Sequence, residues 1–138
     1  MLIKKRVGQL VKKYNTNDPI KLAEELGIKV EYEPLGTILG YYSKSHRIKV
    51  IHINESASSE KQIFICSHEL GHAVLHPNVN TPFLKANTLF STDKIEQEAN
   101  EFAIELMLSK DVVSPITLDE AIEVYGIPRQ HLYKKIYV

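Results

Sequence analysis

Two histidines stand four residues apart in the segment His68-Glu69-Leu70-Gly71-His72, inside an apolar stretch of the chain. Four residues are about one helical turn, or about 6 Å of rise, so both imidazoles can lie on one helix face and reach a single metal ion. Apolar residues at 63–65, 70 and 73–74 predict that most of this helix is buried, and buried histidines need partners. We therefore expect the chain to fold around a helix that holds a metal ion.

The predicted metal-binding helix covers residues 59–76. Ser59 followed by Gln62 has the form of a capping box, which favours a start near Glu60, and Pro77 limits the other end. The alternative is a helix with two surface histidines, and the apolar neighbours disfavour it.

Glu69 follows the first histidine and faces the same opening, so its carboxylate can accept the proton of a metal-bound water. Zinc lowers the pKa of such a water to about 7 and polarises the carbonyl under attack. The pattern thus predicts one zinc ion held by His68 and His72, with Glu69 as the catalytic residue. Two histidines and a carboxylate also suit manganese or iron, so another divalent ion stays an alternative.

A catalytic zinc site needs a third protein ligand and an open position. A second helix is predicted over residues 92–109, with a buried stripe that includes Ile95 and Ala99. Glu96 lies at the margin of this stripe, so we expect it to be the third ligand, and Glu98 is the next candidate. Asn100, one turn after Glu96, can hydrogen-bond a ligating histidine and fix its tautomer. The other glutamates of this helix are predicted to be surface charges, and so is Glu98 if it is not a ligand.

The remaining histidines and the cysteine fit the site less well. His76 is two turns from His68, or about 12 Å along the axis, which is too far for one ion. We expect it to lie at the helix end or to contact a ligand. Cys66 is predicted to be a buried structural thiol, and His46, His52 and His131 are isolated.

The whole chain is predicted to be one α+β domain, residues 1–138. Residues 1–26 should form two helices, the second capped by Asp18 and opened by Pro19. Residues 28–54 alternate between apolar and polar, which predicts three strands, at 28–32, 37–42 and, with a one-residue slip, 48–53, with a turn at 43–45. Short connections favour a small antiparallel sheet packed on the metal-binding helix and the ligand-bearing helix. Residues 117–137 should form a C-terminal helical pair, capped by Thr117 and Glu120.

Composition excludes several classes of protein. The 138 residues are 43% hydrophobic, enough for an ordinary core, and the 17 basic and 17 acidic residues give no net charge. This balance argues against direct nucleic-acid binding, and no apolar run approaches the roughly 20 residues of a membrane span. A single cysteine and an N-terminus without a signal-peptide pattern favour the cytoplasm.

These residues resemble the ImmA/IrrE family of metallo-endopeptidases. The resemblance rests on residues 64–76 and 95–108, together with Gly40-Tyr41 and the segment Ile51-His52-Ile53-Asn54, and it covers most of residues 28–110. It implies a zincin-type site like that of thermolysin-type peptidases, whose third ligand is a glutamate four residues before an acidic or amide residue. Glu96 and Asn100 match this pattern. It also implies that the partner is a helix-turn-helix repressor, cleaved to release phage, mobile-element or stress genes.

Three questions stay open at this point. The domain could keep zinc and bind a repressor without cutting it. It could also be a DNA-binding regulator, because residues 118–125 and 129–136 resemble a helix-turn-helix pair, although the zero net charge speaks against this. The sequence does not identify the group that stabilises the oxyanion, and Tyr41, Tyr42 and His46 are candidates.

Overall fold

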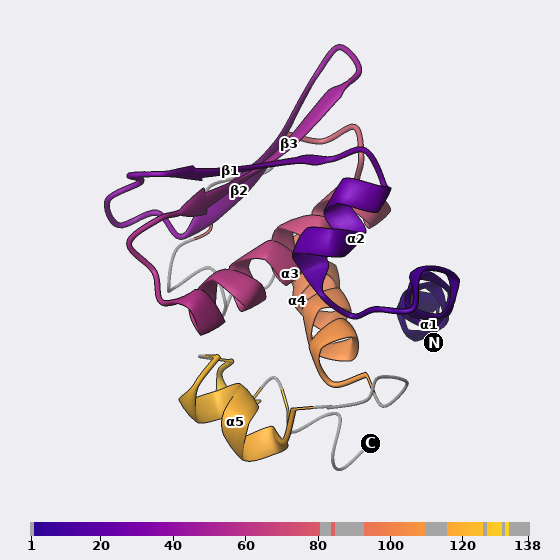
Figure 1. Cartoon of the computed structure of the whole chain (residues 1–138), viewed down its shortest axis with the longest axis vertical. Coiled ribbons are helices and arrows are strands. Elements are labelled where there is room, and N and C mark those ends of the chain that lie inside the picture. The colour runs from indigo at the N-terminus through magenta and orange to yellow at the C-terminus, as the bar shows by residue number, and fades with distance from the viewer. Residues whose placement is uncertain are drawn as a thin grey trace.

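The computed structural model describes residues 2–80, 84, 93–109, 116–125, 127–130 and 132. Its helices lie on one side of a small sheet, so the α+β class expected from the sequence is confirmed (Figure 1). The elements, in chain order, are α1 (Leu2–Tyr14), α2 (Pro19–Glu25), β1 (Lys29–Glu33), β2 (Gly40–Ser45), β3 (Ile48–Asn54), α3 (Ser59–Leu75), α4 (Lys94–Met107) and α5 (Leu118–Glu123). None of the described helices is long and apolar enough to cross a membrane.

The two N-terminal helices form where the sequence predicts them. The buried stripe of α1 consists of Ile3, Val7, Leu10 and Val11, at helical spacing. Asp18 caps α2 because its side chain accepts a hydrogen bond from the Ile20 N–H, and Pro19 is the first helical residue. The chain leaves α2 through Gly27 at φ +74°, a backbone conformation that a side chain would strain.

The sheet is mixed, so the expectation of an antiparallel sheet is wrong for one of its two strand pairs. The strand order is β1-β3-β2, with β3 antiparallel to β2 but parallel to β1. Consecutive strands do run in opposite directions, as short connections require. The hairpin β2–β3 folds back so that β3, not β2, lies beside β1. Because β1 and β3 run in the same direction, the pair is parallel.

The strand boundaries also differ from the expectation. The segment 43–45, predicted as a turn, belongs to β2, and the turn follows directly after it, where His46 has φ +58°. The predicted slip within 48–53 is absent because β3 pairs with β2 in one unbroken register from Ile48 to Ile53. Ile51 and Ile53 therefore point to the buried face, and Ile48 lies at the exposed end of β3.

The N-cap of helix α3 lies one residue earlier than the sequence predicted. The N-cap is Ser58, whose hydroxyl accepts from the Lys61 N–H, so the predicted capping box of Ser59 and Gln62 is wrong. Gln62 instead donates its amide to the backbone carbonyls of the preceding turn, including that of Ala57 at 3.0 Å. Serines at both positions made the two starts hard to separate by sequence.

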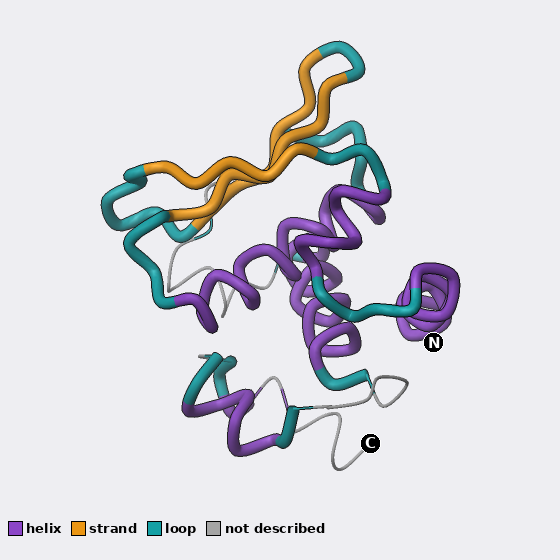
Figure 2. The backbone as a smooth tube through the Cα atoms, viewed as in Figure 1, coloured by secondary structure: helices purple, strands orange, loops and turns teal. Residues whose placement is uncertain are grey.

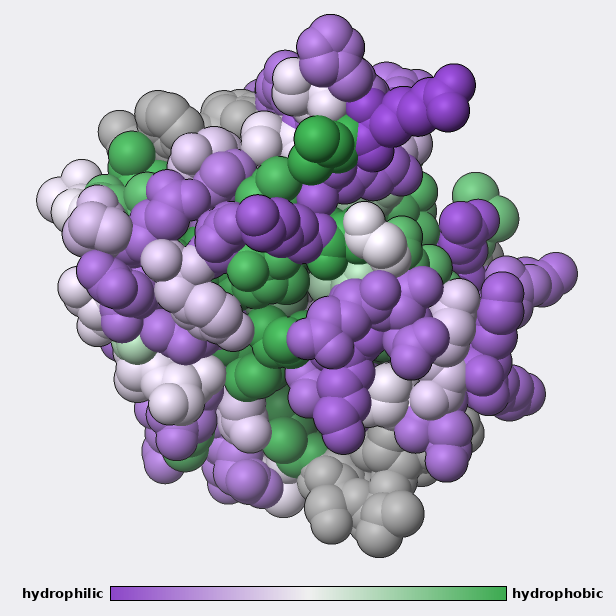
Figure 3. All heavy atoms as spheres, turned by 45° about the horizontal axis from the view of Figure 1, so that its top comes forward, coloured by the Kyte–Doolittle hydropathy of each residue, from purple (hydrophilic) through white to green (hydrophobic). Residues whose placement is uncertain are grey.

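Helix α3 forms the middle layer of the molecule. The sheet packs on one side of it and α4 crosses on another side, while α2 contacts α3 and β1, and α1 packs on α4 (Figures 1 and 2). This central place explains why residues 64–73 of α3 are buried without interruption. The opposite face of the sheet carries no helix among the described residues. In the view that brings the sheet forward, hydrophilic side chains dominate, with a narrow hydrophobic band between them (Figure 3).

The C-terminal region is described in part. Helix α5 begins with the predicted capping box, in which Thr117 and Glu120 exchange hydrogen bonds of 3.1 Å. The second helix of the predicted pair, at 128–136, falls mostly outside the described residues.

Candidate metal centre

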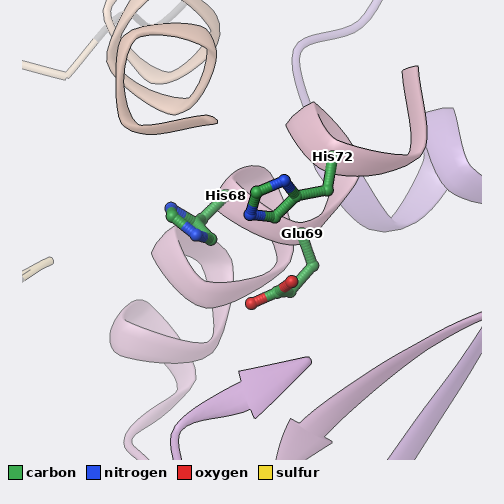
Figure 4. A group of neighbouring side chains, drawn as sticks. All are labelled: His68, Glu69 and His72. Atoms are coloured by element: carbon green, nitrogen blue, oxygen red, sulfur yellow. The ribbon is translucent and has the colours of Figure 1, made fainter. Parts of the chain in front are cut away.

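Helix α3 presents three chemically active side chains together. His68, Glu69 and His72 each offer a ligand atom within 4.8 Å of the others, and all three are buried. The two imidazoles meet edge to face, with ring centroids 4.9 Å apart. In Figure 4 the two rings lie side by side and the Glu69 carboxylate is directed toward the strands.

A close crossing of α3 and α4 brings Glu96 to these histidines. Gly71 makes the crossing possible, because a Cβ at this position would stand 3.0 Å from the Phe102 Cβ and 3.2 Å from the Ala99 Cα. Contacts that short require the neighbouring atoms of α4 to move by a few tenths of an ångström. The sequence motif therefore does two tasks, since its histidines supply nitrogen donors and its glycine lets the carboxylate helix approach.

The Glu96 carboxylate lies between the two imidazoles. Its Oε1 atom is 3.1 Å from the Nε2 of His68 and 3.1 Å from the Nε2 of His72. In tetrahedral coordination, two donor atoms that are each about 2.0–2.1 Å from an ion lie about 3.3 Å apart. Both distances from the Glu96 Oε1 atom are within a few tenths of an ångström of that value, so the residues fit a shared metal ion.

Two carboxylates lie in this cluster, and their environments differ. Burial alone would raise the pKa of Glu96, but hydrogen bonds from His68 and His72 outweigh it and lower the pKa to about 2. Burial raises the pKa of Glu69 to about 8, with nearby His72 opposing and Glu96 reinforcing the rise. The first environment suits an anionic ligand, and the second suits a group that takes up and releases a proton near neutral pH.

Glu69 is the side chain in the cluster that lacks partners. It is 1% exposed, and neither of its oxygens has a hydrogen-bond partner among the described residues. A buried carboxylate without a partner carries a large desolvation cost, and a metal-bound water would supply the donor that offsets it. Gly40 of β2 lies against this side chain, because a Cβ at Gly40 would be 3.8 Å from the Glu69 Cγ.

Asn100 contacts the other side of His68, as the sequence predicted. Its Oδ1 lies 2.8 Å from the His68 Nδ1, and both residues are buried. When a metal ion takes the place of the proton on the His68 Nε2, the remaining ring proton is on Nδ1 and is donated to this oxygen. This contact would hold the ring in the tautomer that a metal ion needs.

Glu98 contacts His76. The sequence predicted it to be a surface charge if it is not a metal ligand, and this contact gives it a further role. Its Oε1 lies 2.9 Å from the Nε2 of His76, and the His76 Nδ1 lies 3.0 Å from the Nδ1 of His72. His76 caps the C-terminal end of α3 and contacts a predicted ligand, which agrees with the expectation for it. The sequence alone could not pair it with Glu98, because that contact depends on how α4 is rotated against α3.

The other candidates lie apart from the cluster. Cys66 is buried, as predicted, and burial raises the pKa of its thiol. His52 is on the face of the sheet away from α3, with Nδ1 2.6 Å from Glu33 and its ring stacked on Tyr41. Tyr42 is buried and donates its hydroxyl to the Pro77 carbonyl at 2.8 Å. His131 falls outside the described residues.

Leu84 packs beside the strand that carries Gly40, and the sequence did not predict this. It is buried and bridges to Gly40, with a 2.8 Å hydrogen bond from its N–H to the Gly40 carbonyl. The segment around it has no hydrophobic period, so no sequence signal could have placed it there.

Comparison with known proteins agrees with this geometry. A family model for the IrrE N-terminal-like domain, a peptidase family, matches residues 23–129. The chain belongs to the ImmA/IrrE family of metallopeptidases. Membership implies a metal ion, and His68, Glu69 and His72 are a group in the described residues that could bind one.

Two relatives of this ImmA/IrrE family member are informative. It is 45% identical over 140 residues to the uncharacterized immunity region protein 2 of Bacillus phage phi105, a match that covers 97% of this chain and 89% of that protein. It is 32% identical over 114 residues to the metallopeptidase ImmA of Bacillus subtilis (strain 168). That match covers 81% of this chain and 66% of ImmA, so the chain spans about two thirds of ImmA's length.

Proposed function

We propose that this protein is a zinc-dependent endopeptidase that cleaves a helix-turn-helix repressor in the cytoplasm. His68, His72 and Glu96 are the proposed ligands of one zinc ion, and Glu69 is the proposed catalytic residue. The observation that carries the proposal is the buried Glu69 carboxylate, which has no partner among the described residues and lies beside two imidazoles that share a second carboxylate.

The chemistry follows from the different tasks of the two carboxylates. When bound, a zinc ion supplies Lewis acidity, which lowers the pKa of water to about 7 and polarises a carbonyl. Glu96 stays anionic and completes the ligand set. Glu69 accepts the proton of the attacking water as its oxygen bonds to the peptide carbon, and it returns this proton to the leaving amine as the C–N bond breaks. One water is consumed and two peptides result.

Burial sets a condition on this reaction. His68, Glu69, His72 and Glu96 are all at most 1% exposed, so a peptide has no direct route to Glu69 in this conformation. The proposal therefore requires a rearrangement that opens the site when the substrate binds. Each of the three oxyanion candidates is engaged or placed elsewhere: Tyr42 donates its hydroxyl to the Pro77 carbonyl, Tyr41 stacks on His52, and exposed His46 lies in the hairpin turn.

The proposed substrate class rests on the proteins that this chain is similar to. One relative is named for a phage immunity region and the other is the metallopeptidase ImmA. The family resemblance implies cleavage of a helix-turn-helix repressor of phage or mobile-element genes, and a relative from a phage immunity region fits that setting. This part of the proposal depends on relatives and on the family resemblance, and not on the geometry of the site.

Co-expression tests the proposal. The wild-type chain and its Glu69→Gln variant are each produced with the repressor encoded nearest to the gene, and the repressor is followed by intact mass. We expect the wild type to cut it at one site and the variant to leave it whole while still holding zinc. An intact repressor in both cultures, with zinc in both proteins, would favour a non-catalytic repressor-binding protein.

A further inference from the structure

His72 has a partner on the side of its ring that faces away from Glu96. Its Nδ1 lies 3.0 Å from the Nδ1 of His76, whose Nε2 lies 2.9 Å from the Oε1 of Glu98. The three side chains form a continuous hydrogen-bonded series from the cluster to the surface. Their side-chain exposures are 1% for His72, 10% for His76 and 33% for Glu98. His76 comes from the end of α3 and Glu98 from α4, so this series of hydrogen bonds also links the two helices.

The direction of each hydrogen bond follows from the chemistry of the groups. A carboxylate only accepts, so Glu98 requires a proton on the Nε2 of His76. A neutral His76 then has its lone pair on Nδ1 and accepts from the Nδ1–H of His72. A metal-binding His72 is neutral, so with its proton on Nδ1 its lone pair is on Nε2, the atom that lies 3.1 Å from the Glu96 Oε1. The opposite arrangement puts a proton on that atom and prevents it from binding a metal.

We propose that His76 and Glu98 are positioning residues, which hold His72 in the tautomer that binds the metal through Nε2. The inference rests on the proposed metal site and adds residues outside its ligand set. It assigns to His72 the same kind of support that Asn100 gives to His68 at 2.8 Å. Both ligating histidines would then be oriented by acceptors that α4 supplies, directly for His68 and through His76 for His72.

A matched pair of substitutions at His76 separates hydrogen bonding from packing. His76→Asn keeps an acceptor oxygen beside the His72 Nδ1, as Asn100 does for His68, and His76→Leu removes the acceptor but keeps apolar bulk. The measured quantity is the dissociation constant for zinc, by competition with a chromophoric chelator. Loss of an outer partner of a ligating histidine lowers metal affinity by about 10–100-fold. We expect about a 10-fold loss or more for His76→Leu and an affinity near wild type for His76→Asn.

A second pair of substitutions tests Glu98, the exposed end of the hydrogen-bonded series. Glu98→Gln retains an oxygen that accepts from His76, and Glu98→Ala does not. We expect Glu98→Ala to weaken zinc binding and Glu98→Gln to preserve most of it, while Glu101→Ala, a change at an exposed glutamate of the same helix, has no effect. Because Glu98 is partly exposed, these variants are expected to fold even if a change at His76 does not.

The ring nitrogens of His72 give a direct readout. In the zinc-loaded protein labelled with nitrogen-15, we expect the His72 Nδ1 to carry a proton and its Nε2 to bind zinc. Equal zinc affinity in His76→Leu, His76→Asn and the wild type, or zinc on the His72 Nδ1, would overturn the positioning role. A wild-type protein that binds no zinc would instead overturn the metal site on which the inference rests.

Discussion

Gly71 of α3 and Ala99 of α4 lie so close that a Cβ on Gly71 would stand 3.2 Å from both the Cα and the carbonyl oxygen of Ala99. This approach holds Glu96, one turn before Asn100, within reach of the two imidazoles. The spacing between α3 and α4 therefore decides whether the three proposed ligands can share an ion.

A methyl group at position 71 should separate the helices. Gly8, in the interior of α1, is a matched control because a Cβ added there would meet nothing within 4 Å. Both changes gain the same helix propensity, so their difference isolates the overpacking, which costs about 1–3 kcal/mol. We expect Gly71→Ala to be less stable than Gly8→Ala by this amount in urea unfolding, and to bind zinc more weakly. Equal stabilities would contradict the close packing.

The corrected start of α3 makes a second prediction. Ser58 caps the helix and Ser59 is already inside it. Loss of an N-cap hydroxyl costs about 1 kcal/mol, and a change at an uninvolved surface position stays within about 0.5 kcal/mol. Ser58→Ala should therefore lower the thermal stability and Ser59→Ala should barely change it. The reverse order would restore the cap that the sequence first indicated.

The raised pKa of Glu69 makes the stability of the metal-free protein depend on pH. Burial raises this pKa to about 8, above the value of about 4.5 for an ordinary glutamate, so the folded state binds a proton more tightly than the unfolded state. Glu69 therefore favours folding at low pH, and this contribution is lost as the pH rises from about 5 through about 8. Glu96, whose pKa is lowered to about 2, has the opposite effect: its contribution to stability is present above about pH 4.5 and is lost as the pH falls toward about 2.

Glu69→Gln removes the first effect and leaves the second. The free energy of unfolding of the variant, relative to the wild type and measured in chelator, should rise steadily between about pH 5 and pH 8. A difference that stays constant over this range would mean that Glu69 is not held in an apolar environment.

The sequence predicted which candidate site residues lie together better than it predicted the strand order, and the reason is the range of the interactions. Four-residue spacing fixes His68 and His72 on one helix face, and the apolar stripe of α4 fixes Glu96 at its margin, so local periodicity is sufficient. Whether β3 lies outside β2 or between β1 and β2 depends on contacts between distant segments. No spacing within a strand encodes that choice.

Three details were beyond sequence reasoning for specific reasons. Ser58 and Ser59 are chemically equal as caps, so a shift of one residue is invisible in the sequence. Leu84 lies in a segment whose apolar residues follow no helical or strand period, and its place in the fold depends on its bridge to Gly40. The contact between His76 and Glu98 requires the relative rotation of two helices, which neither helix specifies alone.

Restoring the metal to the stripped protein tests the central claim most directly. The purified chain is freed of metal, mixed with the purified repressor, and followed by intact mass as one equivalent of zinc is added, beside Glu69→Gln and Glu96→Gln. We predict cleavage at one peptide bond by the wild type only after zinc is added, zinc binding without cleavage by Glu69→Gln, and weakened zinc binding by Glu96→Gln. Cleavage by Glu69→Gln at the wild-type rate, or by the wild type in chelator, would contradict the account.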